Sequence, residues 1–311
     1  MARGHREEGG LIWSVERICD VLRCEYGVSI SRSGYYAYKS RKPSARSIRD
    51  EYYKEKIVAE YYENYSCYGV RKMWRELRKQ GNCDLARCTV ERLMKELDLK
   101  GSKRGKVKRT TVAADGVTCA ADLVNRVFYA DEPNRIWVAD FTYVSTWEGW
   151  CYSAFIVDVF ARRIIGWCVS TRMNRTLVAN AFALAVFARK QHGLSDLSEL
   201  IHHNDKGSQY TADDFVELLA LHGVQTSIGS VGDSYDNALA ETINGTYKTE
   251  LIGKFGPWKT FEELQYETAR WVKWYNEKRI NEYCDYQTPQ EVEQVWYATG
   301  IDSRKGVERV A

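Results

Sequence analysis

The sequence predicts an α/β protein in which a helical region precedes a core built on a mixed five-stranded sheet. Up to about residue 97, apolar residues recur at the three- and four-residue spacing of helices. From residue 136 onward, three runs rich in β-branched and aromatic residues are followed by alternating helical and strand patterns. Strand runs followed by alternating α and β units are typical of a mixed sheet with helices on its faces.

Length and composition indicate a folded protein of two domains, or of one domain with a sizeable appendage. The chain has 311 residues, of which 44% are apolar and 13% aromatic, so it can bury a sizeable core. No stretch reaches the roughly 20 apolar residues that cross a bilayer, and the first residues lack the apolar segment of a signal peptide. We therefore expect a cytoplasmic protein without a membrane partner. The nine cysteines include no CxxC pair, which favours small buried side chains over a zinc cluster.

The expected helical region covers residues 1–109 and contains two helix-turn-helix patterns. The first spans residues 14–38, with a turn around Gly27. In the second, Gly81 separates two helices whose apolar residues lie at i, i+3, i+4 and i+7: Val70, Met73, Trp74 and Leu77, then Val90, Leu93, Met94 and Leu97. Such a pair can present its second helix to a DNA major groove. The same periodicity also fits a helical hairpin with an ordinary charged surface.

Basic residues around the second pattern are candidate DNA contacts. The net charge is only +3, but residues 100–109 hold six basic residues and no acid. Concentrated Lys and Arg are the electrostatic footprint of a phosphate-backbone partner, and a solvated linker is the alternative. The candidates are Arg87, Thr89 and Arg92 at the start of the second helix, Arg71 and Lys72 on the outer face of the first, and Lys103 and Arg104 in the basic run.

The second half of the chain carries the strands. Residues 110–133 lose any period and are expected to link the helical region to a core at 134–299, which is followed by a tail at 300–311. The expected strands are 136–144, 152–160, 163–170, 200–204 and 225–228, and the expected helices are 176–190, 212–222, a helix around Glu241, and 261–278. This order matches an RNase H-like fold with five strands.

Three acidic residues stand out in this core. Asp140 lies in the first strand, Asp205 directly follows the strand at 200–204, and Glu241 lies on an amphipathic helix. Open mixed sheets commonly bind ligands at the carboxyl ends of their strands. Carboxylate oxygens are the ligands that Mg²⁺ prefers, and two Mg²⁺ ions about 4 Å apart support the transfer of a phosphodiester. The sequence therefore predicts phosphoryl transfer on nucleic acid with Asp140, Asp205 and Glu241 as ligands of two Mg²⁺ ions, for which Mn²⁺ can substitute.

Two lysines near these acids are candidate contacts to substrate phosphate. On a 3.6-residue period, Lys248 shares the helix face of Glu241, and Lys206 lies in the turn that follows Asp205.

Other polar residues near the three acids are expected to be structural. His202 and His203 should pack or position the turn, because a metal-bound nucleophile needs no histidine base. The remaining acids are expected in turns, N-caps or the first turns of helices: Asp158, Asp213, Asp214, Asp233 and Asp236.

These segments resemble the integrase-core transposases of bacterial insertion sequences, and more closely the second-frame (OrfB) proteins of the insertion-sequence-three family. The resemblance runs from about residue 15 to about residue 291 and includes WVADFTYV, HHNDKGSQY and YDNALAETINGTYKTEL. The 35 residues between Asp205 and Glu241 match the family spacing, and Asn204 replaces the usual serine before the second aspartate.

The resemblance implies a DNA transposase that cleaves DNA and transfers strands at insertion-sequence ends through Asp140, Asp205 and Glu241. The implied partners are double-stranded DNA with terminal repeats, target DNA, further copies of the chain in the active complex, and the upstream-frame OrfA product, joined as a frameshift fusion. Two hypotheses from other classes stay open at this point. One is a DNA-binding regulator or inactive remnant with a silent core, and the other is an RNA/DNA-hybrid hydrolase on the same fold.

Overall fold

The computed structural model describes residues 13–103 and 121–304, apart from residues 195, 206, 208, 211 and 230–236. It divides the chain into two compact units, Met1–Glu55 and Lys56–Ala311, which are treated separately below. Four of the residues singled out in the sequence lie outside the described ranges: Arg104, Lys206, Asp233 and Asp236.

The first unit contains the first predicted helix pair. Helix α1 (Val15–Tyr26) begins after Ser14, whose side chain accepts a hydrogen bond from Arg17 N, and ends at Gly27 with a φ of 66°. Helix α2 (Arg32–Ser40) follows. The next helix, α3 (Ala45–Glu63), was not predicted. Its larger side chains are mainly tyrosines mixed with charged residues, so they form only a weak apolar stripe.

The second predicted helix pair opens the second unit and is confirmed. Helix α4 (Val70–Lys79) and helix α5 (Arg87–Glu96) are joined by the turn around Gly81. The residues that the period placed inward are buried: Met73 and Leu77 on α4, and Val90, Leu93 and Met94 on α5. Trp74 fixes the turn because its indole N–H donates to the carbonyl of Leu85 at 2.7 Å.

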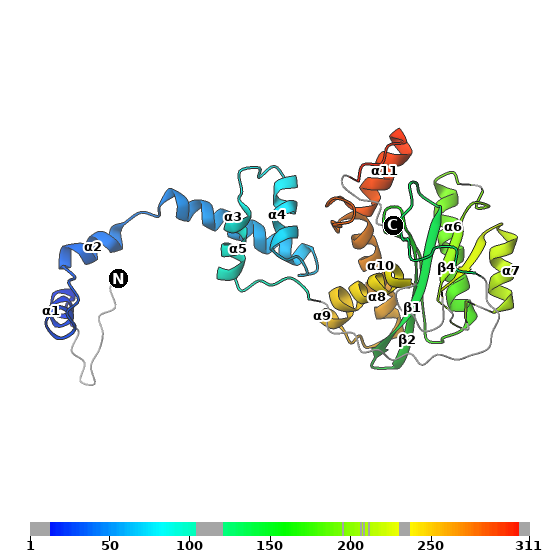
Figure 1. Cartoon of the computed structure of the whole chain (residues 1–311). Coiled ribbons are helices and arrows are strands. Elements are labelled where there is room, and N and C mark those ends of the chain that lie inside the picture. Colours follow the sequence, from blue (N-terminus) through cyan, green and yellow to red (C-terminus); the bar gives the residue numbers. More distant parts are fainter. Residues whose placement is uncertain are drawn as a thin grey trace. The chain divides into compact units, whose positions relative to one another are not determined.

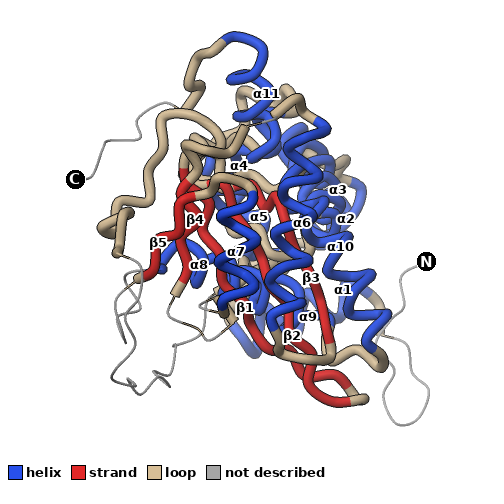
Figure 2. The backbone as a smooth tube through the Cα atoms, turned by 90° about the vertical axis from the view of Figure 1, so that its right-hand side faces the viewer, coloured by secondary structure: helices blue, strands red, loops and turns tan. Residues whose placement is uncertain are grey.

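A mixed five-stranded sheet forms the centre of the second unit, as predicted (Figures 1 and 2). Its order is β3-β2-β1-β4-β5. The first three strands pair antiparallel, and β4 joins β1 in parallel. The bounds are β1 (Ile136–Thr146), β2 (Gly149–Asp158), β3 (Arg163–Ser170), β4 (Ile201–Asn204) and β5 (Gln225–Ile228).

Helices cover both faces of this sheet, and Figure 1 shows α6 and α7 on the side opposite to α8 and α10. The first side carries α6 (Arg175–Gln191) and α7 (Asp213–Leu221), whose Phe182 and Phe215 pack with Trp137 of β1. Helix α6 approaches β3 so closely that a Cβ on Gly166 would lie 2.2 Å from the carbonyl oxygen of Ala181. The other side carries α8 (Ala238–Tyr247), the π-helical turn η2 (Lys248–Ile252), α9 (Gly253–Phe255) and α10 (Phe261–Glu277).

Aromatic side chains fill the second face of the sheet. Phe155 of β2 contacts both Tyr247 and Trp271, with ring centroids 4.9 and 6.0 Å apart. The hydroxyl of Tyr247 is 2.7 Å from that of Thr268 on α10. Trp271 and Trp274 of α10 are both buried and belong to this core.

A buried ion-pair network attaches the last helix, α11 (Pro289–Thr299), to the sheet. Arg189 of α6 donates to Glu293 of α11 at 2.6 Å and to Asp158 at the end of β2 at 2.8 Å, and all three side chains are at most 1% exposed. Asp158 also accepts from the backbone N–H groups of Asn134 and Phe160, which confirms its structural role. Helix α11 was not predicted.

Part of the segment expected to be a linker packs on the sheet edge. Val124 and Ala130 are buried, and the backbone N–H of Leu123 donates to Ser227 Oγ of β5 at 2.9 Å. In the expected tail, Arg304 is buried and donates to the carbonyls of Phe160 and Ala130. No helix within the described ranges is both long and apolar enough to cross a membrane.

The histidines of β4 are packing residues, as predicted. His202 lies between Phe182 and Phe215, and burial lowers its pKa to about 4. His203 Nδ1 is 2.8 Å from Ser227 Oγ of β5. These two contacts tie β4 to a helix on one side and to the neighbouring strand on the other.

Replacing His202 should therefore change how the protein responds to acid. A histidine whose pKa is depressed in the folded state stabilises that state above its unfolded pKa near 6.5, and this stability is lost as the pH falls toward 4. The loss is on the order of 3 kcal/mol at lower pH. In denaturant titrations, the free energy of unfolding of His202→Phe should fall less than that of wild type as the pH is lowered from 6.5 to 4. If the free energy of unfolding changed equally with pH in both proteins, His202 would not be buried in its neutral form.

Candidate active site

The parallel pairing of β1 with β4 brings two of the predicted acids together. The last registered pair of these strands is Ala139 with Asn204, and the next residue on each strand is an aspartate, Asp140 and Asp205. Neighbouring strands lie about 4.8 Å apart, so the backbones of Asp140 and Asp205 lie next to each other. Ala139 packs into the core on the α6 side, which leaves Asp140 on the opposite face.

Helix α8 brings the third acid to the same place. Asn237 at its start donates through Nδ2 to the carbonyl of Ala139 at 3.0 Å. One helical turn after Glu241, Asn244 donates through Nδ2 to Asp140 Oδ2 at 2.8 Å. These two bonds hold the helix along β1, and Glu241 shares the helix face of Asn244 because residues three apart are neighbours. The face with Leu239, Ile243 and Tyr247 is buried toward the sheet, as predicted.

The clustered carboxylates perturb one another. Burial and the charge of Asp205 raise the pKa of Asp140 to about 8, and Glu241 adds to the rise. Hydrogen bonds from Phe141 N and from Asn244 oppose this shift because they stabilise the charged form. Burial of its carboxyl also raises the pKa of Asp205, while a hydrogen bond from Gly207 N lowers it. Asp205 is an exposed residue overall, so solvent screens its charge more than that of half-buried Asp140.

Two further side chains border the acids. Tyr210 is buried, and within the described part of the chain its hydroxyl has no hydrogen-bond partner. Burial and the charges of Asp140 and Asp205 raise its pKa well above the usual value. Lys248 places its ammonium 4.5 Å from the centre of the Tyr143 ring, and burial lowers its pKa while Asp140 opposes this shift.

The sequence analysis missed Asn237, Asn244 and Tyr210. Asn244 had a detectable signal, because it lies three residues after Glu241 on the same helix face. Asn237 and Tyr210 had none, since their partners are set by tertiary packing.

The chemistry of the donors fits a divalent cation. The site offers hard carboxylate oxygens. Burial, and then the charge of Asp205, raise the pKa of Asp140, and a bound cation would favour its ionised form. Among the residues that the structure describes, no three acidic, histidine or cysteine side chains are arranged to hold a metal ion. The carboxylates are thus neighbours, and metal ligation would require their side chains to converge further.

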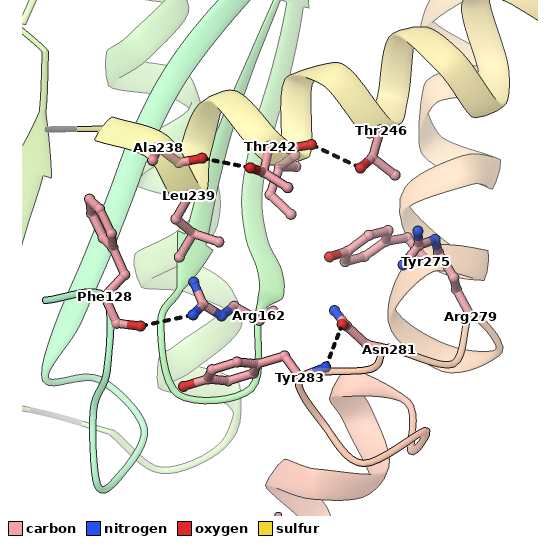
Figure 3. A pocket seen from close by; sticks show the side chains of 11 residues that line it. Phe128, Arg162, Ala238, Leu239, Thr242, Thr246, Tyr275, Arg279, Asn281 and Tyr283 are labelled. Carbon is pink, nitrogen blue, oxygen red and sulfur yellow. Dashed lines mark hydrogen bonds between the residues drawn. The ribbon is translucent and has the colours of Figure 1, made fainter. Parts of the chain in front are cut away.

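A pocket of about 380 Å³ lies beside another face of α8 (Figure 3). Arg162, which donates to the Phe128 carbonyl at 2.8 Å, forms one wall with the ring of Tyr283. Thr242 and Thr246 line the helix side, and both hydroxyls donate to carbonyls of α8 itself. The lining includes none of the three acids, so the pocket is separate from the carboxylate cluster.

The competing acids of α7 have the structural roles expected for them. Asp213 and Asp214 lie in the first turn, where carboxylates favour the positive end of the helix dipole. Asp214 also pairs with Arg175 at 2.5 Å on the surface.

The predicted DNA contacts of the helix pair differ in their surroundings. Arg87 is exposed at the start of α5, Thr89 is half-buried, and Arg92 pairs with Glu96 at 2.7 Å. On α4, Arg71 bonds to Glu282 at 2.8 Å, and the Lys72 ammonium lies 5.4 Å from the centre of the buried Tyr68 ring. Arg71 is exposed, as its predicted outward placement requires, and its ion pair with Glu282 lies on the surface. The structure corrects the outward placement of Lys72, because its side chain is partly buried beside the Tyr68 ring. Lys103 is exposed.

Comparison with family models places two domains on the chain. The integrase core domain matches residues 130–234, and a second integrase core model matches residues 222–289. An HTH-like domain matches residues 47–107, which contain α4 and α5.

Curated relatives match nearly their whole length. A protein of Mycobacterium tuberculosis named "Putative transposase for insertion sequence element IS986/IS6110" is 51% identical over 86% of this chain and 96% of its own. The transposase for insertion sequence element IS629 of Shigella sonnei is 45% identical over 91% of this chain and 96% of its own. Among solved structures, the HTLV-2 integrase catalytic core domain in complex with magnesium aligns with a TM-score of 0.40 and 17% identity, over 52% of this chain and 97% of that one.

Removing the charge of Asp140 should stabilise the metal-free protein at high pH only. The folded state loses stability as the pH rises through the raised pKa of about 8, whereas an unfolded aspartate ionises near 4. In EDTA, Asp140→Asn should have a higher Tm than wild type at pH 8, by about 2–4 °C per kcal/mol of repulsion relieved. The gain should shrink at pH 5, and Asp214→Asn should show no such dependence. An equal gain at both pH values would contradict the proposed repulsion.

Proposed function

Because this chain belongs to the insertion-sequence-three family of transposases, which carry an integrase core, we propose that Asp140, Asp205 and Glu241 are its catalytic carboxylates. The chain acts in DNA transposition and integration as a polynucleotidyl transferase. The observation that carries the residue assignment is the register of β1 with β4, which sets Asp140 beside Asp205, together with the Asn244 bond that holds α8 over them.

The three carboxylates would hold two Mg²⁺ ions, with Mn²⁺ as a substitute. When bound, such ions activate the oxygen nucleophile, neutralise charge on the phosphorus oxygens and support the leaving 3′ oxygen. Ligation would also stabilise the ionised form of Asp140, whose pKa is raised in its absence. Asp140 would take part in holding the ions together with Asp205 on the neighbouring strand and Glu241 on α8, because it interacts with the charges of both.

Neighbouring side chains would orient the acids and the substrate. Asn244 fixes Asp140 by donating to one of its oxygens, and so turns the other carboxylate oxygen toward a different partner. Lys248 would bind a substrate phosphate as a point charge, two helical turns along from Glu241. Tyr210, buried beside Asp140 and Asp205, limits the access of water to the same edge of the site.

We propose that the HTH-like domain binds double-stranded DNA with terminal repeats through α5. Arg87, Thr89 and Arg92 lie on the first turns of this helix, where the recognition helix of such domains meets base edges and phosphates. Lys103, and Arg104 and Lys206 beyond the described residues, would add phosphate contacts. Arg71 and Lys72 become DNA contacts only if their partners in the core release them.

The active species is proposed to be a fusion with the upstream-frame OrfA product, acting in the cytoplasm on DNA of the nucleoid. Two element ends and a target must meet in one complex, so at least two copies of the chain are expected there. Neither the regulator nor the hybrid hydrolase explains the whole chain as well, because the family relatives are transposases that match both domains.

Substituting Asp205→Asn should abolish strand transfer while leaving the fold and most DNA binding intact. The amide keeps the size of the side chain but cannot supply a charged oxygen to a cation. The assay uses the chain fused to its upstream-frame partner, DNA with the element's own ends, and either Mg²⁺ or EDTA. Asp213→Asn, an exposed acid of α7, is the matched control and should remain active. Product from Asp205→Asn, or specific binding by wild type without product even in Mn²⁺, would reject the assignment.

Substituting Arg87→Ala should weaken binding to all DNA sequences and lower the slope of log K against log salt by about 1, because one phosphate contact is lost. Arg71→Ala is the matched control, since Arg71 pairs with Glu282. Fluorescence anisotropy across a salt series measures both. A larger effect of Arg71→Ala than of Arg87→Ala would show that α4, and not α5, faces the DNA.

A further inference from the structure

Three large aromatic side chains are exposed where β1 turns into β2. Trp147 is 77% exposed, Trp150 59% and Tyr143 52%. Tyr143 and Trp150 contact each other edge to face, with centroids 5.6 Å apart. We call these three residues the hairpin aromatic surface. Single exposed rings are common on this chain, but several exposed rings on one hairpin mark a candidate interaction surface.

The hairpin that carries these rings is held in place by its own contacts. The hydroxyl of Thr146 donates to the carbonyl of Gly149 at 2.9 Å, which closes the turn. The backbone N–H of Trp147 donates to the carbonyl of Trp258 at 3.0 Å. Glu148 accepts from the backbone N–H of Phe261 at the start of α10. The rings are therefore presented from a fixed backbone, so ordering them on binding would cost little entropy.

Lys248 links this surface to the carboxylate cluster. Tyr143 lies three residues beyond Asp140 on β1, about 10 Å along the strand at 3.3 Å per residue, and this odd spacing turns its side chain to the opposite face of the strand. Lys248 spans this interval, because its ammonium lies 4.5 Å from the Tyr143 ring and its charge interacts with Asp140. A strand that leaves the carboxylates would thus meet first a cation and then exposed rings.

We propose that the hairpin aromatic surface stacks on unpaired bases of the DNA strand held at the carboxylate cluster, while Lys248 binds the phosphate between them. The proposal rests on the proposed function and adds a substrate feature to it, a strand end that is locally unpaired. Aromatic side chains stack on bases of any sequence, but only where the base face is free of a pairing duplex.

The charges at the hairpin favour bases over a duplex backbone. Glu148 places a carboxylate at the tip, beside Trp147, and this charge would repel phosphates there while leaving neutral bases unaffected. The neighbouring cation, Lys248, lies at the Tyr143 end of the surface, where its charge interacts with Asp140. A second copy of the chain is the competing occupant and is treated as an outcome of the test.

The test is a binding assay in EDTA, so that no strand is cut. The probe is an element-end duplex with a three-nucleotide unpaired tail that contains 2-aminopurine, and a fully paired duplex of the same sequence serves for comparison. Stacking should quench the fluorescence of the tailed probe on wild type. Trp150→Ala should abolish the quenching and weaken tailed-DNA binding at least about fivefold, the lower limit for one stacked base. Binding of the paired duplex should not change.

Two variants control for packing and for hydrophobicity. Trp150→Phe should restore most of the tailed-DNA binding, because it keeps a ring. Phe187→Ala removes an equally exposed ring from α6 and should have no effect. Sedimentation of each variant reports oligomeric state.

If Trp150→Ala weakened the binding of tailed and paired DNA equally, or weakened neither, the proposal would be overturned. A change in oligomeric state without a change in quenching would assign the surface to a second copy instead. The stacking readout is separate from catalysis, since Asp205→Asn should retain it. In wild type, failure of strand transfer with intact quenching would therefore count against the catalytic assignment, and absence of quenching with intact strand transfer would count against the aromatic surface.

Discussion

The parallel pairing of β1 with β4 is the constraint on which the acidic site depends. Strand β4 has only four residues, yet its register with β1 decides whether Asp205 lies beside Asp140. Its position is secured on both sides, because His202 packs among aromatic rings of α6 and α7 and His203 bonds to β5. A shift of one residue would turn Asp205 to the other face of the sheet. His202 and His203 thus affect the position of Asp205 by holding β4 in its register with β1.

This placement has a cost in stability, which the surrounding residues reduce only in part. Burial, together with the charges of Asp205 and Glu241, raises the pKa of Asp140, even with donors from Phe141 N and Asn244. The charged network of Asp158, Arg189 and Glu293 shows the opposite arrangement, in which buried carboxylates meet a guanidinium. Within one sheet, therefore, the carboxylate of Asp158 meets a guanidinium, whereas that of Asp140 meets other carboxylates. That difference separates the structural acid from the catalytic candidate.

The sequence alone predicted all five strands, most helices of the core, and the two aspartates at the β1–β4 edge. These predictions succeeded because the spacing of apolar residues, the length of each run and the turn residues are local properties of the sequence. Helix α11 was missed because its central residue, Glu293, is a charged residue in a buried position, and its partner Arg189 is 104 residues away. Lys72 was placed outward for a similar reason, since its neighbour Tyr68 lies outside its own helix. Periodicity identifies the polar face of a helix, but it cannot identify which neighbour covers that face.

Helix α10 gives these separate parts a common support. Its Trp271 packs on Phe155 of the sheet and on Tyr247 of the helix that carries Glu241. One turn later, Trp274 donates to Asn64 and packs against Tyr65, at the entrance to the HTH-like helices. Through Trp271 and Trp274, the same helix therefore supports the aromatic face beneath α8 and the residues that precede α4.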